Sequence, residues 1–307
     1  MRTTTTATPG TAISHYLDAM RNRGPLSIDW AAAPTRHKRY PGTERVPLPW
    51  APDPASALGL LGELLRDLLG MTRIVWSHHL DDGGAPTGRP PMLLTGRPAP
   101  SGGGLYPIEA YVAAGGPGLP AALYHYDPVH HVLERVRDGD HVPALNGLAA
   151  GGGEADMVVA LSAVFWRSMF KYGDFGYRLI CQETGVLIAQ ALAVGERLGL
   201  AGRACLRFPD GEVNRLLGLD GAREATLALL TLTLPPASTA PQGVTTARTS
   251  ARQLMSRPVA AESRPLPRPM PDGPAAALHR ASTLPTSAPP SASPSASPSA
   301  SPSASPS

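Results

Sequence analysis

Residues 97–107 read Arg-Pro-Ala-Pro-Ser-Gly-Gly-Gly-Leu-Tyr-Pro. Three consecutive glycines expose backbone N–H groups and let the chain approach a ligand closely. Ser101 adds a hydroxyl donor, and Arg97 adds a planar cation suited to a phosphate or to the polar edge of a ring. These donors suit a flat heterocycle with many acceptors, such as a flavin. On the residues alone, a flexible turn remains the simpler interpretation.

A second motif, Phe170-Lys171-Tyr172-Gly173, lies between an apolar run and a long helical pattern. A lysine and a tyrosine at such a boundary can place an ammonium and a phenol at one pocket. Burial lowers the pKa of a lysine and makes it a usable base, while a nearby cation eases the deprotonation of a tyrosine. The alternative is a surface lysine whose stem lies beside a packed tyrosine.

The pattern around these motifs predicts an α+β domain. Helical spacing of apolar residues predicts helices at residues 13–23 with Ser14 as N-cap, 55–69, 177–198 and 210–217. Alternating or continuous apolar runs predict strands at residues 123–126, 132–136, 157–165, 204–208 and 225–234. Residues 105–114 suit a strand, or a short helix leading into one. The elements do not form a repeating β-α-β series, so we expect a mostly antiparallel central sheet flanked by helices.

Two details of this pattern matter below. The segment 81–97 is rich in glycine and proline and is expected to be a loop. The helix at 177–198 is apolar around much of its circumference, which predicts burial on most of its sides.

Composition divides the chain into four parts. Residues 1–12 and the Ser/Pro/Ala repeat at 285–307 have too little to bury and are expected to be disordered. Residues 13–234 form the expected folded domain, and its boundary falls where periodicity ends. The stretch 235–284, rich in proline, serine and arginine, is expected to be a linker or the remnant of a second unit.

Charge and cysteine usage exclude several function classes. The net charge is only +3 over 307 residues and the cations are scattered, so no nucleic-acid partner is expected. The short basic patch at 36–39 is expected to be a solvated turn, with contact to a phosphate or an acidic partner as the alternative. Two isolated cysteines, Cys181 and Cys205, favour a reducing, cytoplasmic compartment. There is no signal-peptide pattern and no apolar run of ~18 residues, so no membrane partner is expected.

Histidines cluster around the predicted hairpin, where His125 and His131 could face one another across the strands. No carboxylate lies at a ligand spacing and no HExxH pattern occurs, so solvated hairpin residues are favoured and no metal is expected. The chain also lacks the GxSxG elbow of serine hydrolases, the phosphate-binding P-loop and the dinucleotide-binding GxGxxG motif.

Together the motifs resemble one family. The segments RPAPSGGGLYPIEAYV, LYHYDP, FKYGDFGYR and QETGVLIAQALAVGERLGL are similar in order and spacing to SagB-type dehydrogenases, a branch of the nitroreductase-like flavoproteins. The resemblance extends over residues 15–234. It includes Lys38-Arg39-Tyr40-Pro41 and Val46-Pro47-Leu48-Pro49 near the N-terminus.

The resemblance implies an α+β sheet with flanking helices and a noncovalent FMN at an interface between two such units. The family oxidises azoline rings in ribosomally made peptides to thiazoles or oxazoles and passes a hydride to the flavin. Ser101, Gly102 and Gly103 match the part that contacts the isoalloxazine ring, and Arg97 precedes it. Lys171 and Tyr172 match the family's Lys-Tyr pair, which takes the ring proton.

The chain departs from the family in the motif that binds the FMN phosphate. An RRSxR pattern usually opens nitroreductase-like flavoproteins, and none precedes Arg97. A degenerate version, with Arg248, Ser250 and Arg252, follows the domain instead. It is either the start of a second unit or a chance match in a linker. If the site needs two units, the chain must form a homodimer.

The sequence therefore favours an FMN-dependent oxidoreductase that acts on a peptide-derived heterocycle or a related small molecule, with a cyclodehydratase as a possible partner. A general NAD(P)H nitroreductase or quinone reductase is the second interpretation. A flavin-free partner subunit of a peptide-maturation complex is the third.

Overall fold

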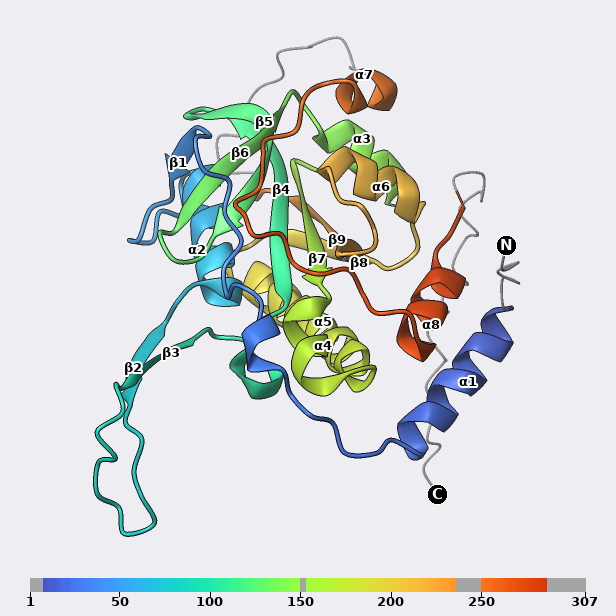
Figure 1. Cartoon of the computed structure of the whole chain (residues 1–307). Coiled ribbons are helices and arrows are strands. Elements are labelled where there is room, and N and C mark those ends of the chain that lie inside the picture. Colours follow the sequence, from blue (N-terminus) through green and yellow to red (C-terminus); the bar gives the residue numbers. More distant parts are fainter. Residues whose placement is uncertain (1–7, 150–152, 236–249, 286–307) are drawn as a thin grey trace, which may run out of the picture.

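The computed structural model describes residues 8–149, 153–235 and 250–285. Its centre is a seven-stranded sheet in the order β1-β6-β5-β4-β7-β9-β8, and every pairing in it is antiparallel (Figure 1). The strands of this sheet are β1 Arg45–Pro47, β4 Ile108–Gly116, β5 Leu119–Asp127, β6 Val132–Asp138, β7 Met157–Val164, β8 Ala201–Cys205 and β9 Glu224–Thr233. The predicted α+β fold with a mostly antiparallel sheet is confirmed.

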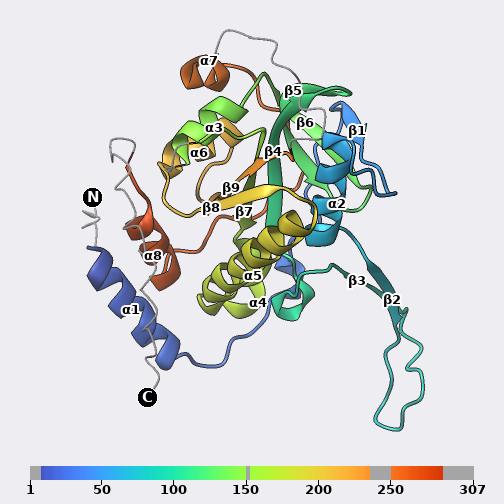
Figure 2. The same cartoon turned by 180° about the vertical axis from the view of Figure 1, so that it is seen from behind.

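Helices cover both faces of the sheet (Figures 1 and 2). They are α1 Pro9–Arg21, α2 Ala57–Leu69, α3 Val142–Leu148, α4 Trp166–Tyr172, α5 Phe175–Arg197, α6 Asp210–Leu217, α7 Ala251–Met255 and α8 Pro274–Ser282, with short 3-10 turns η1 Trp30–Ala32 and η2 Gly102–Gly104. Helix α6 has the predicted bounds, and α2 and α5 lie within two residues of theirs.

Strand alternation divides the core into two clusters. On β4, Ala110 and Val112 face a cluster that includes the buried leucines of α2 and residues of α5. Tyr111 and Ala113 face a second cluster built with α3, α6 and α7. Strand β7 is buried along its whole length, as its continuous apolar run predicted.

Helix α5 is buried on one side only. Its buried residues include Ile180, Leu187 and Ala191, whereas Val186 and Leu192 are exposed. The expectation of burial on most sides is therefore wrong for the described chain, which leaves an apolar stripe of α5 uncovered. In the part of the chain that the structure describes, no helix is both long and apolar enough to cross a membrane.

The N-terminal helix starts earlier than expected. Helix α1 begins at Pro9, whose fixed φ suits the first turn of a helix, and Ala12 is buried. Ser14 is not an N-cap but an interior residue whose hydroxyl donates to the carbonyl of Gly10. Disorder predicted for residues 1–12 is thus wrong from Pro9 onward, while residues 1–7 lie outside the described residues.

The expected loop at 81–97 contains a strand. Strand β3 (Met92–Gly96) pairs with β2 (Arg73–Ser77) in a separate two-stranded ribbon. Glycines and prolines between the two strands obscured this pairing in the sequence. The ribbon projects away from the body of the molecule in both views (Figures 1 and 2).

Residues 250–285 pack onto the domain, which corrects the prediction of a linker or remnant from residue 235. Leu254 and Ala275 are buried in the core. The extended stretch between them donates backbone hydrogen bonds, from Ala260 to Val136 and from Ser263 to Arg39, both at 2.8 Å. Backbone pairing leaves no periodic side-chain pattern, so the sequence did not show it. The segments 236–249 and 286–307, including the expected disordered tail, lie outside the described residues.

Candidate functional site

Residues 97–107, called the glycine loop here, form a tight turn between the β2–β3 ribbon and β4. Gly103 and Gly104 have φ angles of 66° and 65°, in the left-handed region that glycine tolerates best. Ser101 holds the turn from within, because its Oγ accepts a hydrogen bond from the backbone N–H of Tyr106 at 2.8 Å. Ser101 thus shapes the loop from within.

Glu183 on α5 anchors the same loop. Its Oε1 accepts the backbone N–H of Gly102 at 2.8 Å. The side chain is buried, and burial raises its pKa, although the donors from Gly102 and Ser101 oppose this. Sequence reasoning did not single out Glu183, which stands unmarked inside a helical pattern. Its proximity to the loop depends on which face of α5 meets the turn.

Lys171 and Tyr172 end α4 beside the glycine loop. A Cβ added to Gly103 would collide with the phenol oxygen of Tyr172 and would lie 3.1 Å from the Nζ of Lys171. Both side chains are half-buried, and Gly103 itself is exposed. The structure therefore brings together the two motifs that the sequence singled out, residues 97–107 and residues 170–173. The first precedes β4 in the chain and the second follows it.

Arg97 is a buried cation without a hydrogen-bonding partner for its terminal nitrogens. Its guanidinium lies over the ring of Tyr106, 5.0 Å from the centroid. Nη1 and Nη2 find no acceptor among the described residues. Burial lowers the pKa of Arg97, and the nearby Glu109 opposes this shift. A buried donor pair of this kind requires an acceptor, and a carbonyl or anionic group of a ligand would supply one.

A small cavity adjoins Arg97 and Glu183. Its volume is about 10 Å³, and its walls include Ala99, Pro100 and Leu187. That is room for one water molecule at most. A heterocyclic ring does not fit inside it, so a ring bound here must lie on the exposed side of the glycine turn.

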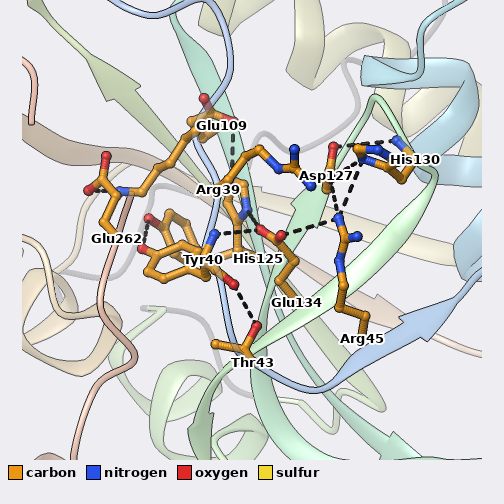
Figure 3. A network of polar contacts seen from close by, with 12 residues as sticks. Arg39, Tyr40, Thr43, Arg45, Glu109, His125, Asp127, His130, Glu134 and Glu262 are labelled. Atoms are coloured by element: carbon orange, nitrogen blue, oxygen red, sulfur yellow. Dashed lines mark hydrogen bonds and ion pairs between the residues drawn. The ribbon is translucent and has the colours of Figure 1, made fainter. Parts of the chain in front are cut away.

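A buried ionic network links three strands of the sheet (Figure 3). His125 on β5 lies between two carboxylates, with Nε2 at 3.2 Å from Glu109 and Nδ1 at 3.1 Å from Glu134. Burial disfavours its charged form, but the two carboxylates outweigh burial and raise the pKa of His125. Burial alone would raise the pKa of Glu109. Arg167, at 2.5 Å, and His125 outweigh this effect and hold the pKa of Glu109 well below its usual range.

The prediction of solvated hairpin histidines is therefore wrong for His125, and also for His131. The two do not face one another. His131 is buried, with Nε2 at 3.1 Å from the carbonyl oxygen of Pro49 and Nδ1 at 2.9 Å from the hydroxyl of Tyr126. A carbonyl only accepts, so Nε2 donates and Nδ1 accepts from the tyrosine. Among the described residues, no group of three histidine, cysteine or carboxylate side chains could hold a metal ion.

The basic patch at 36–39 is not a solvated turn at its centre. Lys38 is buried, and its Nζ lies 2.5 Å from Glu224 and 3.0 Å from Glu262. Burial favours the neutral amine, but the two carboxylates raise the pKa of Lys38 instead. The lysine thus ties the N-terminal segment to β9 and to the C-terminal segment.

The degenerate phosphate motif lies elsewhere. Ser250 is the N-cap of α7, where it accepts the N–H of Gln253 in a capping box, and Arg252 follows in the same turn. Helix α7 lies at the opposite end of the molecule from α4 in both views (Figures 1 and 2). One chain therefore does not bring Ser250 and Arg252 to the glycine loop, and Arg248 lies outside the described residues.

Comparison with known proteins agrees with this fold and loop. The profile of the nitroreductase family matches residues 79–232, which is half of the chain. The chain belongs to the nitroreductase family. A solved nitroreductase-like protein from Anabaena variabilis ATCC 29413 superposes with a TM-score of 0.62 at 27% identity, over 73% of this chain and 46% of that one.

Two relatives of this nitroreductase-family chain are processing proteins, according to their names. The microcin B17-processing protein McbC of Escherichia coli is 30% identical over 140 residues, which are 43% of this chain and 52% of McbC. The trifolitoxin-processing protein TfxB of Rhizobium leguminosarum bv. trifolii is 30% identical over 156 residues, 45% of this chain and 40% of TfxB. The chain spans about half the length of the curated relatives it matches.

Proteins of the nitroreductase family are flavoproteins, typically with FMN. The residues of this site fit such a group. Arg97 offers two buried N–H donors without acceptors, and the exposed turn at Gly103 and Gly104 lets a flat ring approach the backbone. Lys171 and Tyr172 stand at the edge of that turn.

Proposed function

We propose that this chain is an FMN-dependent oxidoreductase that dehydrogenates azoline rings in ribosomally made peptides to azoles. The observation that carries the proposal is the contact of Lys171 and Tyr172 with the glycine turn at Gly103. The names of McbC, a microcin B17-processing protein, and TfxB, a trifolitoxin-processing protein, support this choice of substrate.

The chemistry requires a base beside a hydride acceptor. Converting an azoline to an azole removes one proton and one hydride from the ring, and FMN, when bound, supplies the hydride acceptor. Lys171 and Tyr172 would take the proton from the ring carbon, since they are the amine and phenol nearest the turn. Their half-buried position also limits water around the reacting ring.

Other residues would position the cofactor. Arg97 would donate to an electron-rich edge or phosphate of the flavin, for which its orphaned nitrogens are suited. Glu183 and Ser101 would hold the turn in shape, with the N–H of Gly102 already directed to Glu183. Ser250 and Arg252 would reach a flavin phosphate only from a second copy of the chain.

A homodimer is part of the proposal. The uncovered stripe of α5 consists of small and apolar residues at helical spacing: Gly185, Val186, Ala189, Leu192 and Ala193. Such a stripe suits close packing against another helix. We further propose a cytoplasmic enzyme that works with a cyclodehydratase, whose azoline product would be the substrate.

The test starts with purified full-length chain. Bound FMN gives a yellow protein with a flavin absorbance band, and an azoline-containing peptide should lose two mass units on oxidation. Lys171→Ala and Tyr172→Phe should retain flavin and lose this activity. Colourless protein that takes up no FMN would point to a flavin-free partner subunit. Flavin-loaded protein that reduces nitroaromatics or quinones with NAD(P)H, but leaves azolines unchanged, would point to a general reductase.

A further inference from the structure

The segment that joins α1 to η1 passes over the C-terminal end of α4. Trp30 opens η1, and its indole meets the ring of Phe170 edge-on, with the ring centroids 5.9 Å apart. Leu26 lies further along the same end of α4, because a Cβ added to Gly173 would be 3.6 Å from one of its methyl groups. The Lys-Tyr pair occupies the two positions between Phe170 and Gly173, so the segment contacts α4 on both sides of the pair.

Both of these apolar side chains are largely in water. Trp30 is 64% exposed and Leu26 is 54% exposed. Single exposed apolar residues are ordinary on a protein surface, but a tryptophan leaves a large apolar area in water and is among the commonest anchors of binding sites. A tryptophan and a leucine next to the candidate base therefore form a surface that a ligand at the site can cover.

The turn that presents Trp30 is held in place by hydrogen bonds. The carboxylate of Asp29 accepts the N–H of Ala31 at 3.0 Å and caps η1. The carbonyl of Ala32 accepts the indole N–H of Trp166 at 2.9 Å, which ties the turn to the first residue of α4. A contact residue on a fixed backbone loses less conformational entropy when a ligand binds. Trp30 is thus preorganised for such a contact.

The same segment continues toward the glycine loop. The guanidinium of Arg36 donates to the carbonyl of Leu93 on β3 at 3.5 Å. The blue turn η1 lies close to the teal turn η2 in both views (Figures 1 and 2). The segment therefore borders the site on one side, from the end of α4 to the strand that leads into Arg97.

We propose that Trp30 and Leu26 bind the peptide substrate on the solvent side of Lys171 and Tyr172, with the indole of Trp30 against an apolar or aromatic residue that neighbours the azoline ring. This inference rests on the proposed function and assigns to it two substrate-positioning residues. An azoline ring is part of a peptide chain, so the residues on either side of it lie on the protein surface around the base.

The charge of this surface supports the choice of neighbouring residue. Trp30 and Leu26 are uncharged and offer apolar area, which suits an apolar side chain. The guanidinium of Arg23 lies over the ring of Phe175, 4.1 Å from its centroid, and brings a positive charge to the same end of α4. A cationic residue beside the azoline ring would therefore be repelled, and an aromatic one could pack edge-on or offset on the indole.

Kinetics with two matched substrates test this contact. The full-length, flavin-loaded protein is assayed with two azoline peptides that differ only in the residue next to the ring, phenylalanine or glycine. Trp30→Ala should raise KM for the phenylalanine peptide about tenfold or more, with kcat, flavin absorbance and thermal midpoint retained. The glycine peptide should be affected less, and Trp30→Phe should recover most of the lost affinity. A purely structural role of Trp30 would affect both peptides equally.

Trp50→Ala is the matched control. Trp50 is 59% exposed, and its ring packs on His131 with the centroids 4.5 Å apart. Removing it takes away a tryptophan of similar exposure that does not contact α4, so KM for both peptides should stay unchanged. An equal rise of KM in Trp50→Ala and Trp30→Ala would overturn the proposal.

Binding measured without turnover separates this inference from the proposed activity. Fluorescence anisotropy of the labelled phenylalanine peptide gives Kd for wild type and for Trp30→Ala. Peptide that binds through Trp30 but is not oxidised would contradict the activity and support the contact. Oxidation with equal KM and Kd in both proteins would overturn the contact and leave the activity standing. Wild-type protein that neither binds nor oxidises the peptide would overturn both. An effect of Trp30→Ala on sedimentation alone would assign Trp30 to a contact between copies and also overturn the inference.

Discussion

The phenol oxygen of Tyr172 occupies the space that a Cβ on Gly103 would fill. The two residues lie on different elements, one at the end of α4 and one in the turn before β4. Their contact makes the turn and the Lys-Tyr pair a single structural unit. A substitution at either Gly103 or Tyr172 should therefore alter the position of the other residue.

Alanine at Gly103 should displace Tyr172. Gly103→Ala adds a Cβ that collides with the tyrosine, on top of the strain of a left-handed φ. Gly104→Ala is the matched control, since its φ is nearly the same and its Cβ would meet open space. We expect the control to lose about 1 kcal/mol of unfolding free energy. Gly103→Ala should lose more, together with at least tenfold in activity. Equal effects of the two variants on activity would show that the contact is unimportant.

The lysine and the tyrosine should affect turnover rather than cofactor binding. Lys171→Ala or Tyr172→Phe should lower kcat on azoline peptide by about 100-fold or more, the usual contribution of a positioned proton acceptor. The flavin content, measured by absorbance after gel filtration, should remain the same. Lys171→Arg keeps the charge without an accessible neutral form and serves as the comparison. Full activity in both the alanine and phenylalanine variants would contradict the assignment of the base.

Glu183 should control the affinity for FMN through the shape of the loop. Glu183→Ala removes the acceptor for the N–H of Gly102. A hydrogen bond to a charged group contributes about 1.5–3 kcal/mol, so binding should weaken about 10- to 100-fold. Glu183→Gln keeps one acceptor oxygen and should weaken it less than tenfold. Titration of apoprotein with FMN, followed by fluorescence quenching, measures both constants.

Lys38 should be critical for stability although it is far from the loop in sequence. Lys38→Met leaves Glu224 buried without a cation, and breaking such a pair costs about 3–5 kcal/mol. Glu262→Gln removes the more exposed of the two carboxylates and leaves the Lys38–Glu224 pair intact, so it should cost about 1 kcal/mol. Urea denaturation of both variants gives the comparison. A loss of similar size in both would mean that Lys38 is not held chiefly by Glu224.

Stability should depend on pH through His125. Its pKa is raised in the folded chain, so its favourable contribution is complete below the unfolded value of about 6.5 and is lost as the pH rises through the folded value. The destabilisation caused by His125→Asn should therefore be larger at pH 6 than at pH 9. Urea midpoints of wild type and variant across this range test the sign. A penalty that grows with pH would contradict a charged His125.

Some of these features were predictable from the sequence. The continuous apolar run of β7 and the bounded periodicity of α6 gave correct elements, because both signals are local. That the glycine turn and the pair Lys171 and Tyr172 share one site was implied by the resemblance to SagB-type dehydrogenases, and the structure places them in contact. The burial of His125 could not be predicted in this way. It depends on contacts with Glu109 on β4 and Glu134 on β6, which are set by how the strands pair.

Contacts between distant segments explain the remaining errors. Lys38 was predicted to be solvated because its partner, Glu224, lies 186 positions away in the chain and leaves no local signal. Glu183 gave no local signal for its bond to Gly102, 81 positions earlier. The stretch between α7 and α8 makes backbone hydrogen bonds to the domain, from Ala260 to Val136 and from Ser263 to Arg39, which any residue type can make.

The tie between Lys38, Glu224 and Glu262 also sets an order of events during synthesis. Lys38 emerges from the ribosome early, while both carboxylates are still to be made. At ordinary rates of translation, about 5–20 residues per second, the nascent chain carries this ammonium in water for ten seconds or more. The N-terminal segment therefore cannot complete this contact until the chain has been made as far as Glu224 and Glu262. Docking of residues near Lys38 is thus a late step of folding, which depends on residues far along the chain.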